Sequence, residues 1–503
     1  MLLRYLIEDI NLDTEKDIIG NIDVAINKIE YDSSKIGEAD VFVAIEGFKT
    51  DGHEYIAEAV RHGASGIVVN KEEVEYVKEI CRGLPQEVCI IATEDTRMIL
   101  SHIACRYYDN PSSKLSVIGI TGTKGKTTTA YMIRDILKQS GKKVGLIGTI
   151  YNEYADVKEE ATRTTPESLD LQRMLSDMVS KEIQYVVMEV SSHALSLHRV
   201  DGIHFDIGVF TNLSEEHLDF HGTMDEYLKA KAKLFENCAF SIINADDLYT
   251  PKLLKLIDGK VAKFGLDNKA EVTATEVRVN NDYVDFKMYI NRQPQVIKVA
   301  IPGRYTVYNA LAAIAVTSML NAQMQDILVA LSNVKVPGRS EVVDINKTFA
   351  VIVDYAHTPS SLEAILVNTK KYVKGRVICV FGCGGNRDTL KRAEMGRIAG
   401  KYANFTVITT DNPRDEKPEN IAKEIERGIK ETRGLHKVIL NRKEAIKFAM
   451  RIAWKNDTVI IAGKGHETYQ ELAGGKKVPF DDREIVKAIA ATMPEKDNVD
   501  VNM

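Results

Sequence analysis

Short apolar runs alternate with helix-like stretches along the middle of this chain. The apolar runs occupy positions 115–118, 144–147, 185–190 and 207–210, and the segments between them have the character of helices. Strands joined by helices in this way are typical of parallel sheets. The pattern therefore predicts an α/β segment whose sheet is covered by helices on both faces.

The two ends of the chain show the same pattern. Near the N-terminus, strand-like runs at 41–45 and 66–69 flank a helical pattern at 55–62. The last third again alternates between strands and helices, with strand-like runs that end at Val353, Phe381, Thr409 and Ala462.

Turn-forming residues mark two boundaries. They are Asn-Pro-Ser-Ser at 110–113 and Pro-Gly at 337–338. A chain of 503 residues is too long for one hydrophobic core. We therefore expect three α/β domains, at 1–110, 111–338 and 339–503.

Composition narrows the class of protein. The chain is 44% hydrophobic and 27% charged, which is typical of a soluble globular protein, and its net charge of -6 argues against a nucleic-acid partner. We expect no signal peptide in its acidic start and no membrane span, because no apolar run approaches ~18 residues. The six cysteines are scattered, which favours free thiols in a reducing cytoplasm.

The glycine-rich string GITGTKGKTTT, at 119–129, lies between an apolar run and a helix-like stretch that begins at Thr127. Glycines let backbone N–H groups surround phosphate oxygens, and the helix N-terminus adds positive potential. Lys126 would reach the outer phosphates and the Thr127 hydroxyl would ligate Mg²⁺. Because five residues rather than four separate Gly119 from Gly125, a plain glycine turn stays open as the alternative. The candidate nucleotide contacts are Gly122, Thr123, Lys124, Gly125, Lys126, Thr127 and Thr128.

Two further residues are candidate metal ligands. Glu189 closes the apolar run at 185–190, from which a carboxylate can face the phosphate loop and bind Mg²⁺. Its alternative role is to accept hydrogen bonds from loop backbone. His217 follows another strand-like run, and its alternative role is structural.

The run Lys229–Leu234 contains three lysines at alternate positions. On a helix, Lys229 and Lys233 share one face, whereas Lys231 points about 200° away from Lys229, toward the apolar side. An ammonium on an apolar face has a lowered pKa, and a neutral amine can add CO₂ to form a carbamate. The alternative is a solvated basic face.

Polar strings follow four strand-like runs in the last third. They occupy 354–357, 382–387, 411–414 and 463–467. Ligands of open parallel sheets bind beyond the carboxyl ends of the strands. Four such strings therefore predict a cleft rather than four ordinary turns.

Four strings together resemble those of a known family. They are TGTKGKTTT at 121–129, MEVSSHAL at 188–195, DYAHTP at 354–359 and GKGHE at 463–467. The chain resembles the Mur ligases, ATP-dependent amide-bond-forming enzymes of peptidoglycan synthesis, over nearly its whole length. The resemblance implies an N-terminal uridine-nucleotide-binding domain, a central P-loop ATPase domain with a parallel sheet, and a C-terminal Rossmann-like domain that binds the incoming amino acid.

The resemblance also implies roles for the phosphate and metal residues. Lys126 corresponds to the lysine that contacts ATP phosphates, while Thr127 and Glu189 correspond to ligands of Mg²⁺. His217 would bind a second Mg²⁺, and Lys231 corresponds to the family's carbamylated lysine. The adenosine contacts correspond to Asn309, Arg339 and Asp354, and the contacts of a UDP-N-acetylmuramoyl-dipeptide to Ser33, Thr164, Thr165, Ser191 and Arg199.

The resemblance also bears on which amino acid the enzyme adds. The site of this amino acid corresponds to Arg387, Asp411, Asn412, Arg414, Gly463 and Glu467. A guanidinium at position 414 favours meso-diaminopimelate, because the distal carboxylate of that amino acid can bind it in bidentate fashion and lysine has none. The alternatives are a ligase that adds L-lysine and a role for Arg414 as a surface arginine.

Three departures from the family and two rival classes accompany this interpretation. The string Asp32-Ser33-Ser34 has serine where the family often has arginine, Ala393 stands where proline is common, and Leu197 replaces a glutamine found in some members. A P-loop nucleotide switch or assembly ATPase would need only the phosphate loop, and folylpolyglutamate synthetases share the ligase layout. We expect a cytoplasmic monomer whose partners are small-molecule substrates, with no nucleic acid and no membrane.

Overall fold

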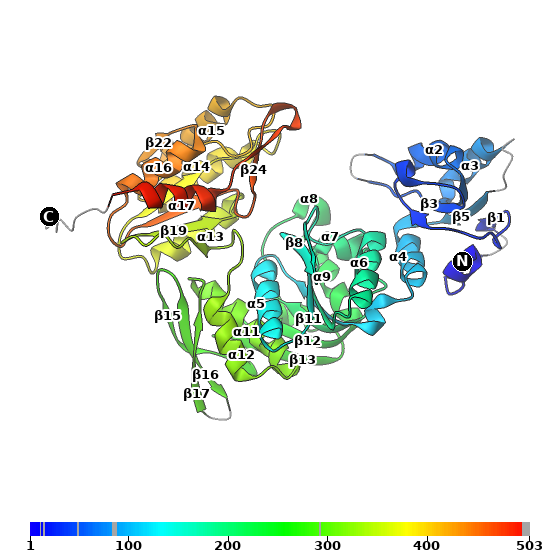
Figure 1. Cartoon of the computed structure of the whole chain (residues 1–503), viewed down its shortest axis with the longest axis horizontal. Helices are drawn as coiled ribbons and strands as arrows, with labels where there is room; N and C mark the ends of the chain where they lie inside the picture. The colour runs from blue at the N-terminus through cyan, green and yellow to red at the C-terminus, as the bar shows by residue number, and fades with distance from the viewer. Residues whose placement is uncertain (11, 14–15, 48–49, 83–87, 291–292, 495–503) are drawn as a thin grey trace. The chain divides into compact units, whose positions relative to one another are not determined.

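The computed structural model describes residues 1–10, 12–13, 16–47, 50–82, 88–290 and 293–494 (Figure 1). The chain divides into two compact units, Met1–Glu271 and Val272–Met503, each of which is described by itself. The division falls inside the segment expected as one central domain, and the boundaries at 110 and 338 stay predictions.

The first unit begins with a five-stranded sheet. Its strand order is β1-β5-β4-β3-β2, with β1 antiparallel to β5 and the other pairs parallel. Val41 and Val43 of β3 pack with α1 and α4, whereas Phe42 packs with α2 and α3 on the other face. The elements are β1 (Ile18–Ile19), β2 (Ile29–Glu30), β3 (Asp40–Val43), β4 (Ala64–Asn70), β5 (Cys89–Thr93), α1 (Leu3–Ile7), α2 (Ile56–Arg61), α3 (Val74–Cys81) and α4 (Thr96–Tyr107).

A second sheet of the first unit carries the phosphate loop. Its strands follow the order β13-β12-β11-β6-β10-β7-β8-β9, and those from β13 to β7 pair in parallel. The strands are β6 (Ser116–Thr121), β7 (Val144–Ile147), β8 (Tyr151–Tyr154), β9 (Val157–Glu160), β10 (Tyr185–Glu189), β11 (Phe205–Phe210), β12 (Cys238–Asn244) and β13 (Lys260–Gly265). The helices are α5 (Lys126–Gln139), α6 (Ser168–Ser180), α7 (Ser192–Ser196), α8 (Leu218–His221), α9 (Met224–Glu236) and α10 (Thr250–Leu253).

The central strands of this sheet are continuously apolar because both of their faces are covered. β6 is buried from Val117 to Thr121, and it lies between β10 and β11. The pairing sets Glu189 opposite Ile120, so that the carboxylate ends its strand beside the start of the phosphate loop. The antiparallel hairpin of β8 and β9 was not predicted, because its short strands are largely polar and partly exposed.

The second unit contains two larger sheets. An antiparallel sheet of β15 (Thr275–Val279), β16 (Val284–Ile290) and β17 (Gln293–Val299) packs with α11 (Arg304–Met319) and α12 (Met324–Asn333). The sequence analysis missed these three strands, which follow the short strand β14 (Val272–Thr273). Their alternating exposed and buried residues give no continuous apolar run.

The other large sheet has the order β18-β19-β23-β20-β21-β22, and only β18 pairs antiparallel. Ile352 of β19 packs with α13, α14 and α15, whereas Val351 and Val353 pack with α16 and α17. The strands are β18 (Glu341–Val342), β19 (Ala350–Asp354), β20 (Val377–Phe381), β21 (Phe405–Ile408), β22 (His436–Val438), β23 (Thr458–Ala462), β24 (Tyr469–Glu471) and β25 (Lys477–Pro479), the last two forming a hairpin. The helices are α13 (Pro359–Lys370), α14 (Leu390–Tyr402), α15 (Pro418–Thr432), α16 (Arg442–Ile452) and α17 (Asp482–Thr492).

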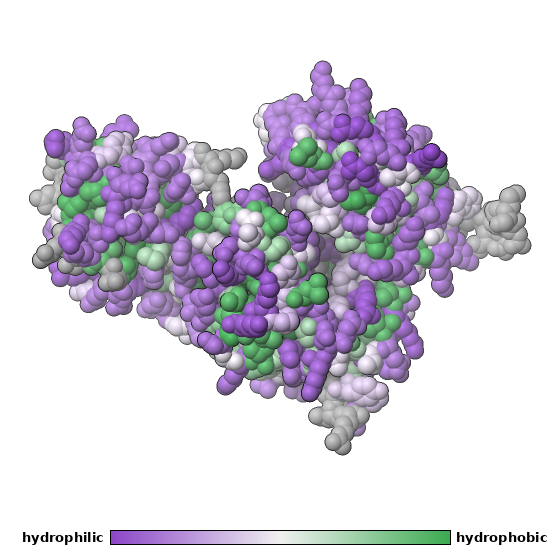
Figure 2. Space-filling view, turned by 180° about the vertical axis from the view of Figure 1, so that it is seen from behind, coloured by the Kyte–Doolittle hydropathy of each residue, from purple (hydrophilic) through white to green (hydrophobic). Residues whose placement is uncertain are grey.

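The surface is mostly hydrophilic on the face that Figure 2 shows. Among the described residues, no helix combines the length and the apolar character that crossing a bilayer requires. All six cysteines are free thiols.

Candidate functional site

The phosphate loop joins β6 to α5 and depends on two glycines. Gly122 has φ 145° and Gly125 has φ 88°, which are values that residues with a Cβ rarely adopt. A Cβ at Gly122 would also lie 1.9 Å from Thr211 Oγ1. The glycines therefore permit the tight turn that directs backbone N–H groups toward a bound anion.

Lys126 lies in the first turn of α5 and reaches back over the loop. Its Nζ donates to the carbonyl oxygens of Gly122, at 2.7 Å, and Thr123, at 3.1 Å. Lys124 is exposed and pairs with Glu216 at 2.7 Å. Thr128 lies one residue after Thr127 on α5. All seven loop residues predicted to contact a nucleotide thus lie in one short strand-to-helix connection.

Glu189 is buried and is held by hydroxyl and amide donors. Thr127 Oγ1 donates to its Oε2 at 2.8 Å, and Thr149 donates through its backbone N–H to Oε1 at 2.8 Å and through its hydroxyl to Oε2 at 3.0 Å. No three His, Cys, Asp or Glu side chains of the described residues converge on one point. A hydroxyl and a carboxylate side by side nevertheless fit Mg²⁺, which usually completes its ligand shell with phosphate oxygens and water.

Lys231 is buried on α9, as the helical pattern predicts, and only 1% of it is exposed. Its Nζ donates to the Gly122 carbonyl at 3.0 Å and lies 4.4 Å from the centroid of the Tyr227 ring. Burial lowers the pKa of Lys231 well below its ordinary value, and the nearby Lys126 ammonium lowers it further. Lys126 and Lys231 thus meet at one loop carbonyl although 105 positions of sequence separate them.

His217 lies at the start of α8 with φ 58°, an uncommon conformation that residues in functional loops often adopt. Its ring makes an edge-to-face contact with His193, with centroids 4.8 Å apart. Burial lowers the pKa of His217 and lowers that of His193 to about 4, which keeps both rings neutral near pH 7. The sequence analysis missed His193 and also His221, which stacks on Tyr227.

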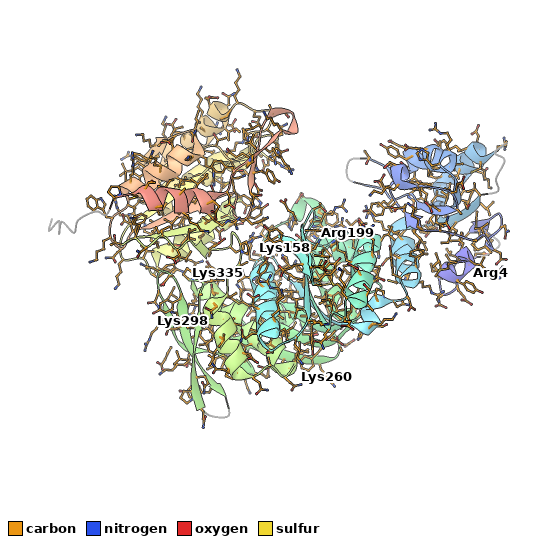
Figure 3. All side chains as sticks on the ribbon, viewed as in Figure 1. Arg4, Lys158, Arg199, Lys260, Lys298 and Lys335 are labelled. Atoms are coloured by element: carbon orange, nitrogen blue, oxygen red, sulfur yellow. The ribbon has the colours of Figure 1, made fainter. Side chains whose placement is uncertain are left out.

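Four residues that correspond to dipeptide contacts gather around the end of β10. Thr165 Oγ1 donates to the Glu189 carbonyl at 2.9 Å and accepts from the Ser191 N–H at 3.1 Å. Thr164 Oγ1 lies 3.1 Å from Thr149 Oγ1, and Arg199 Nη1 donates to the Thr165 carbonyl at 3.3 Å. Figure 3 shows Arg199 in the region of α6 and α7.

A buried carboxylate next to this group was not predicted. Glu167 is 2% exposed and pairs with Arg97 at 3.0 Å, Arg163 at 3.1 Å and Arg199 at 3.3 Å. Two cavities adjoin it, one of about 350 Å³ that includes Tyr31 and Arg163 and one of about 300 Å³ that includes Arg97. Both contain residues of the N-terminal part and of the region after it.

Ser33 is not part of that group. It begins a short 3-10 segment, Ser33–Lys35, in the N-terminal part, and its hydroxyl donates to Glu58 at 2.6 Å.

The residues that correspond to adenosine contacts belong to the second unit. Asp354 ends β19 and accepts from the backbone N–H groups of Ser340 at 2.7 Å and Ala356 at 2.8 Å, while burial raises its pKa. The Arg339 guanidinium lies 4.9 Å from the ring centroid of Tyr355, and Asn309 is buried on α11. The phosphate loop is in the first unit, so these two halves of the predicted ATP site are described apart.

The polar strings after β21 and β23 meet in the second unit. Asn412 Nδ2 donates to Glu467 at 2.9 Å, and the buried Lys464 donates to Asn412 Oδ1 at 2.9 Å and to Glu467 at 2.8 Å. Gly463 has φ 115°, and a Cβ there would lie 2.4 Å from Asp411 Oδ2. Lys464, which links the two strings, was not among the predicted site residues.

Arg414 follows these strings with φ 49° and is held by two oxygen atoms. Its Nε donates to Glu471 on β24 at 2.7 Å, and its Nη1 donates to the Gly385 carbonyl at 2.8 Å. Arg387 is exposed two positions after Gly385. The two predicted acceptor arginines therefore lie on adjacent loops, and Glu471 is a partner that sequence reasoning missed.

A fully buried ion pair supports the same strand ends. Arg442 donates to Asp482 through Nε at 2.8 Å and Nη2 at 2.7 Å, and its Nη2 also donates to the Ala462 carbonyl at 3.1 Å. Both side chains are completely buried. The pair was not predicted, because the two residues lie 40 positions apart in helix-like segments.

The fold and the site together define a nucleotide-binding α/β protein that carries a second α/β unit with a polar cluster at its strand ends. Sequence models of three Mur ligase domains match the chain: the "Mur ligase family, catalytic domain" at 25–108, the "Mur ligase middle domain" at 120–317 and the "Mur ligase, glutamate ligase domain" at 338–465. The chain belongs to the Mur ligase family.

Two relatives and one solved structure similar to this chain share the name UDP-N-acetylmuramoyl-L-alanyl-D-glutamate--2,6-diaminopimelate ligase. A relative from Caldanaerobacter subterraneus subsp. tengcongensis is 48% identical over 94% of this chain and 97% of its own length. A relative from Clostridium acetobutylicum, number 1 of that name, is 45% identical over 97% of this chain and 98% of its own. A solved structure of that name is 29% identical, has a TM-score of 0.67, and is covered to 95% by 93% of this chain.

Proposed function

We propose that this chain is the ATP-dependent ligase that joins meso-2,6-diaminopimelate to UDP-N-acetylmuramoyl-L-alanyl-D-glutamate. The observation that carries the proposal is Arg414, a cation held by Glu471 and Gly385 beside the polar cluster of Asn412 and Glu467. The names of the relatives described above, which are 48% and 45% identical to this chain, support the same substrates.

The first step activates a carboxylate. The free D-glutamyl carboxylate attacks the γ-phosphorus of ATP, which breaks the bond to the β-phosphate oxygen and yields an acyl phosphate and ADP. Electrostatic repulsion between these anions is a main part of the barrier. Lys126 and the loop N–H groups hold the phosphates and offset that repulsion. Thr127 and Glu189 would hold one Mg²⁺ and His217 a second, and the two ions would supply further positive charge.

The second step forms the amide bond. The neutral amine of diaminopimelate attacks the acyl carbon, and the tetrahedral intermediate breaks its bond to the phosphate oxygen, so that phosphate leaves and takes up the proton that the nitrogen loses. This chemistry requires no nucleophile from the protein. His217 is assigned as a ligand rather than a base.

Lys231 has two forms in this proposal. Its burial and its lowered pKa favour a neutral amine, which can add CO₂ and become a carbamate. The carbamate would present two oxygen atoms toward the metal region beside Gly122. Mass spectrometry of the intact protein, prepared with and without bicarbonate, tests this modification by the mass of one CO₂, and no mass difference would contradict it.

The acceptor amino acid is selected by charge. Arg414 and Arg387 would bind the carboxylates of diaminopimelate, while Asp411 and Glu467 balance its ammonium groups. L-lysine lacks the distal carboxylate, and its ammonium would be repelled by Arg414. We also propose that the protein acts on its substrates in the cytoplasm and that it is a monomer.

Phosphate release tests the function directly. The protein is incubated with ATP and UDP-N-acetylmuramoyl-L-Ala-D-Glu, and either meso-diaminopimelate or L-lysine is added. We expect turnover with diaminopimelate only. Turnover with lysine would keep the ligase but refute the role of Arg414, and ATP hydrolysis that needs no UDP-sugar peptide would favour a nucleotide switch.

A further inference from the structure

Two loops of the second unit carry the predicted acceptor arginines, and they are fastened to each other. The Gly385 N–H donates to the Asn412 carbonyl at 2.9 Å, and Arg414 donates back to the Gly385 carbonyl at 2.8 Å. A Cβ at Gly385 would lie 1.9 Å from the Pro413 carbonyl oxygen. The loop around 385 and the loop around 413 are therefore in backbone contact.

A buried arginine on α14 forms hydrogen bonds to both loops. Arg392 is 0% exposed, and it donates to Glu416 through Nη1 at 2.9 Å and through Nη2 at 2.8 Å. Nη2 also donates to the Gly384 carbonyl at 3.2 Å. One guanidinium thus holds the first loop by its backbone and the second loop by a carboxylate.

Glu416 closes the connection. Besides the fork of Arg392, it accepts the backbone N–H of Asn386 at 2.5 Å. Asn386 is the neighbour of Arg387, and Glu416 lies two positions after Arg414. Asn386 has φ 52° and Arg414 has φ 49°, so both loops adopt conformations that need support from their surroundings.

We propose that Arg392 and Glu416 are a positioning pair that sets the distance and direction of Arg387 and Arg414 for the acceptor amino acid. The inference rests on the proposed function, since it assigns the pair to the diaminopimelate site. Arg392 is fully buried and acts through the loops rather than by touching the substrate. Bidentate geometry is what distinguishes arginine from lysine at such a position.

Loosening the pair should affect one substrate only. A carboxylate bound by two guanidinium groups depends on their spacing, and small misplacements of binding groups can cost about 100-fold in rate. The phosphate loop lies in the other compact unit. We therefore expect the KM for diaminopimelate to rise about 10-fold or more in Glu416→Gln, with the KM for ATP and the kcat at saturating diaminopimelate within about 2-fold.

The matched control is a second ion pair made by α14, whose carboxylate lies on α15 rather than in the loop before it. Arg397 on α14 pairs with Glu431 on α15, and both side chains are largely exposed, at 44% and 49%. Glu431→Gln removes one exposed carboxylate without reaching the acceptor loops, so its KM for diaminopimelate should equal that of the wild type. Arg392→Lys should resemble Glu416→Gln, because lysine keeps the charge but loses the fork.

The experiment measures the KM of each of the three substrates, kcat and the melting temperature for the four proteins. If Arg392→Lys fails to fold, Glu416→Gln still decides, since the Glu416 side chain is 31% exposed. A fall in melting temperature without a selective rise in the diaminopimelate KM would overturn the inference and leave the pair a purely structural one. If the wild type turns over without diaminopimelate, both the proposed function and this inference are refuted. If the wild type requires diaminopimelate, the proposed function stands, and the KM values of the variants then test this inference alone.

Discussion

The phosphate loop and the polar cluster around Asn412, Arg414 and Glu467, here called the acceptor cluster, differ in how far apart in sequence their interacting residues lie. Lys126 contacts the carbonyls of Gly122 and Thr123, which precede it by four and three positions. Arg414 contacts Gly385 and Glu471, which are 29 and 57 positions away. A site made of consecutive residues is set largely by local conformation, whereas a site made of distant strand ends depends on the packing of the whole unit.

The two sites should therefore differ in whether a mutation affects function alone or function and stability together. The phosphate loop rests on glycine conformations and on one helix start, so replacing a side chain there should remove function and leave the fold in place. The acceptor cluster rests on buried pairs such as Arg442 with Asp482, where function and stability are coupled.

The largest effect should come from the local site. Lys126→Met removes the ammonium that we propose binds the ATP phosphates, and we expect kcat to fall by about 1,000-fold or more. The melting temperature should stay within about 2 °C of the wild type. The control is Lys229→Met, since Lys229 is exposed and pairs with Glu226 on the same helix. Near-normal turnover of Lys126→Met would remove the lysine from the mechanism.

Asp482→Ala should disrupt the acceptor cluster by removing half of the buried ion pair that supports it. The change removes the bidentate partner of the buried Arg442 cation and leaves it only the Asp411 carboxylate at 4.0 Å, and breaking a buried pair in this way costs about 3–5 kcal/mol. The melting temperature of the second unit should fall by about 10 °C. Calorimetry would show whether the transition assigned to the first unit stays in place, and a common shift of all transitions would contradict the separation of the two sites.

Arg414→Ala tests the acceptor cluster at a residue proposed to contact the substrate, while the buried Arg442–Asp482 pair stays in place. Losing a charge-assisted contact should raise the KM for diaminopimelate by about 10- to 100-fold, or about 1.4–2.8 kcal/mol, and should weaken discrimination against lysine. Arg427→Ala, at an exposed arginine of α15, is the control. Initial rates at varied acceptor concentration measure the effect, and an unchanged KM would make Arg414 an ordinary loop residue.

The smallest effect concerns pH. Burial lowers the pKa of His466 to about 4, below its ordinary value of 6.5. The unfolded chain therefore binds a proton that the folded chain does not, and stability falls as the pH drops from about 6.5 toward 4. Between pH 7 and pH 5 the loss should be about 1–2 kcal/mol. His466→Gln should lose stability less steeply over this window, as melting temperatures at both pH values would show; equal slopes would contradict the assignment.

The sequence predicted the local elements well where pattern and motif agree. The run before Gly119 lies in β6, and the stretch from Thr127 lies in α5, because a buried central strand and a helix that follows a glycine-rich loop each have a clear signature. The apolar side of α9 predicted that Lys231 would be buried. The antiparallel strands β15, β16 and β17 were missed, since partly exposed strands carry no apolar run.

The chain by itself determined the α/β class, the phosphate loop, the helical face of Lys231 and the family. All of these rest on residues that are close in sequence or on short motifs that can be read directly from the chain. Tertiary structure alone decided that Glu167 joins three arginines, that Glu471 holds Arg414 and that Arg392 reaches Glu416. A carboxylate has no sequence signature for the distant cation it pairs with, because pairing depends on where strands end after the sheet has formed.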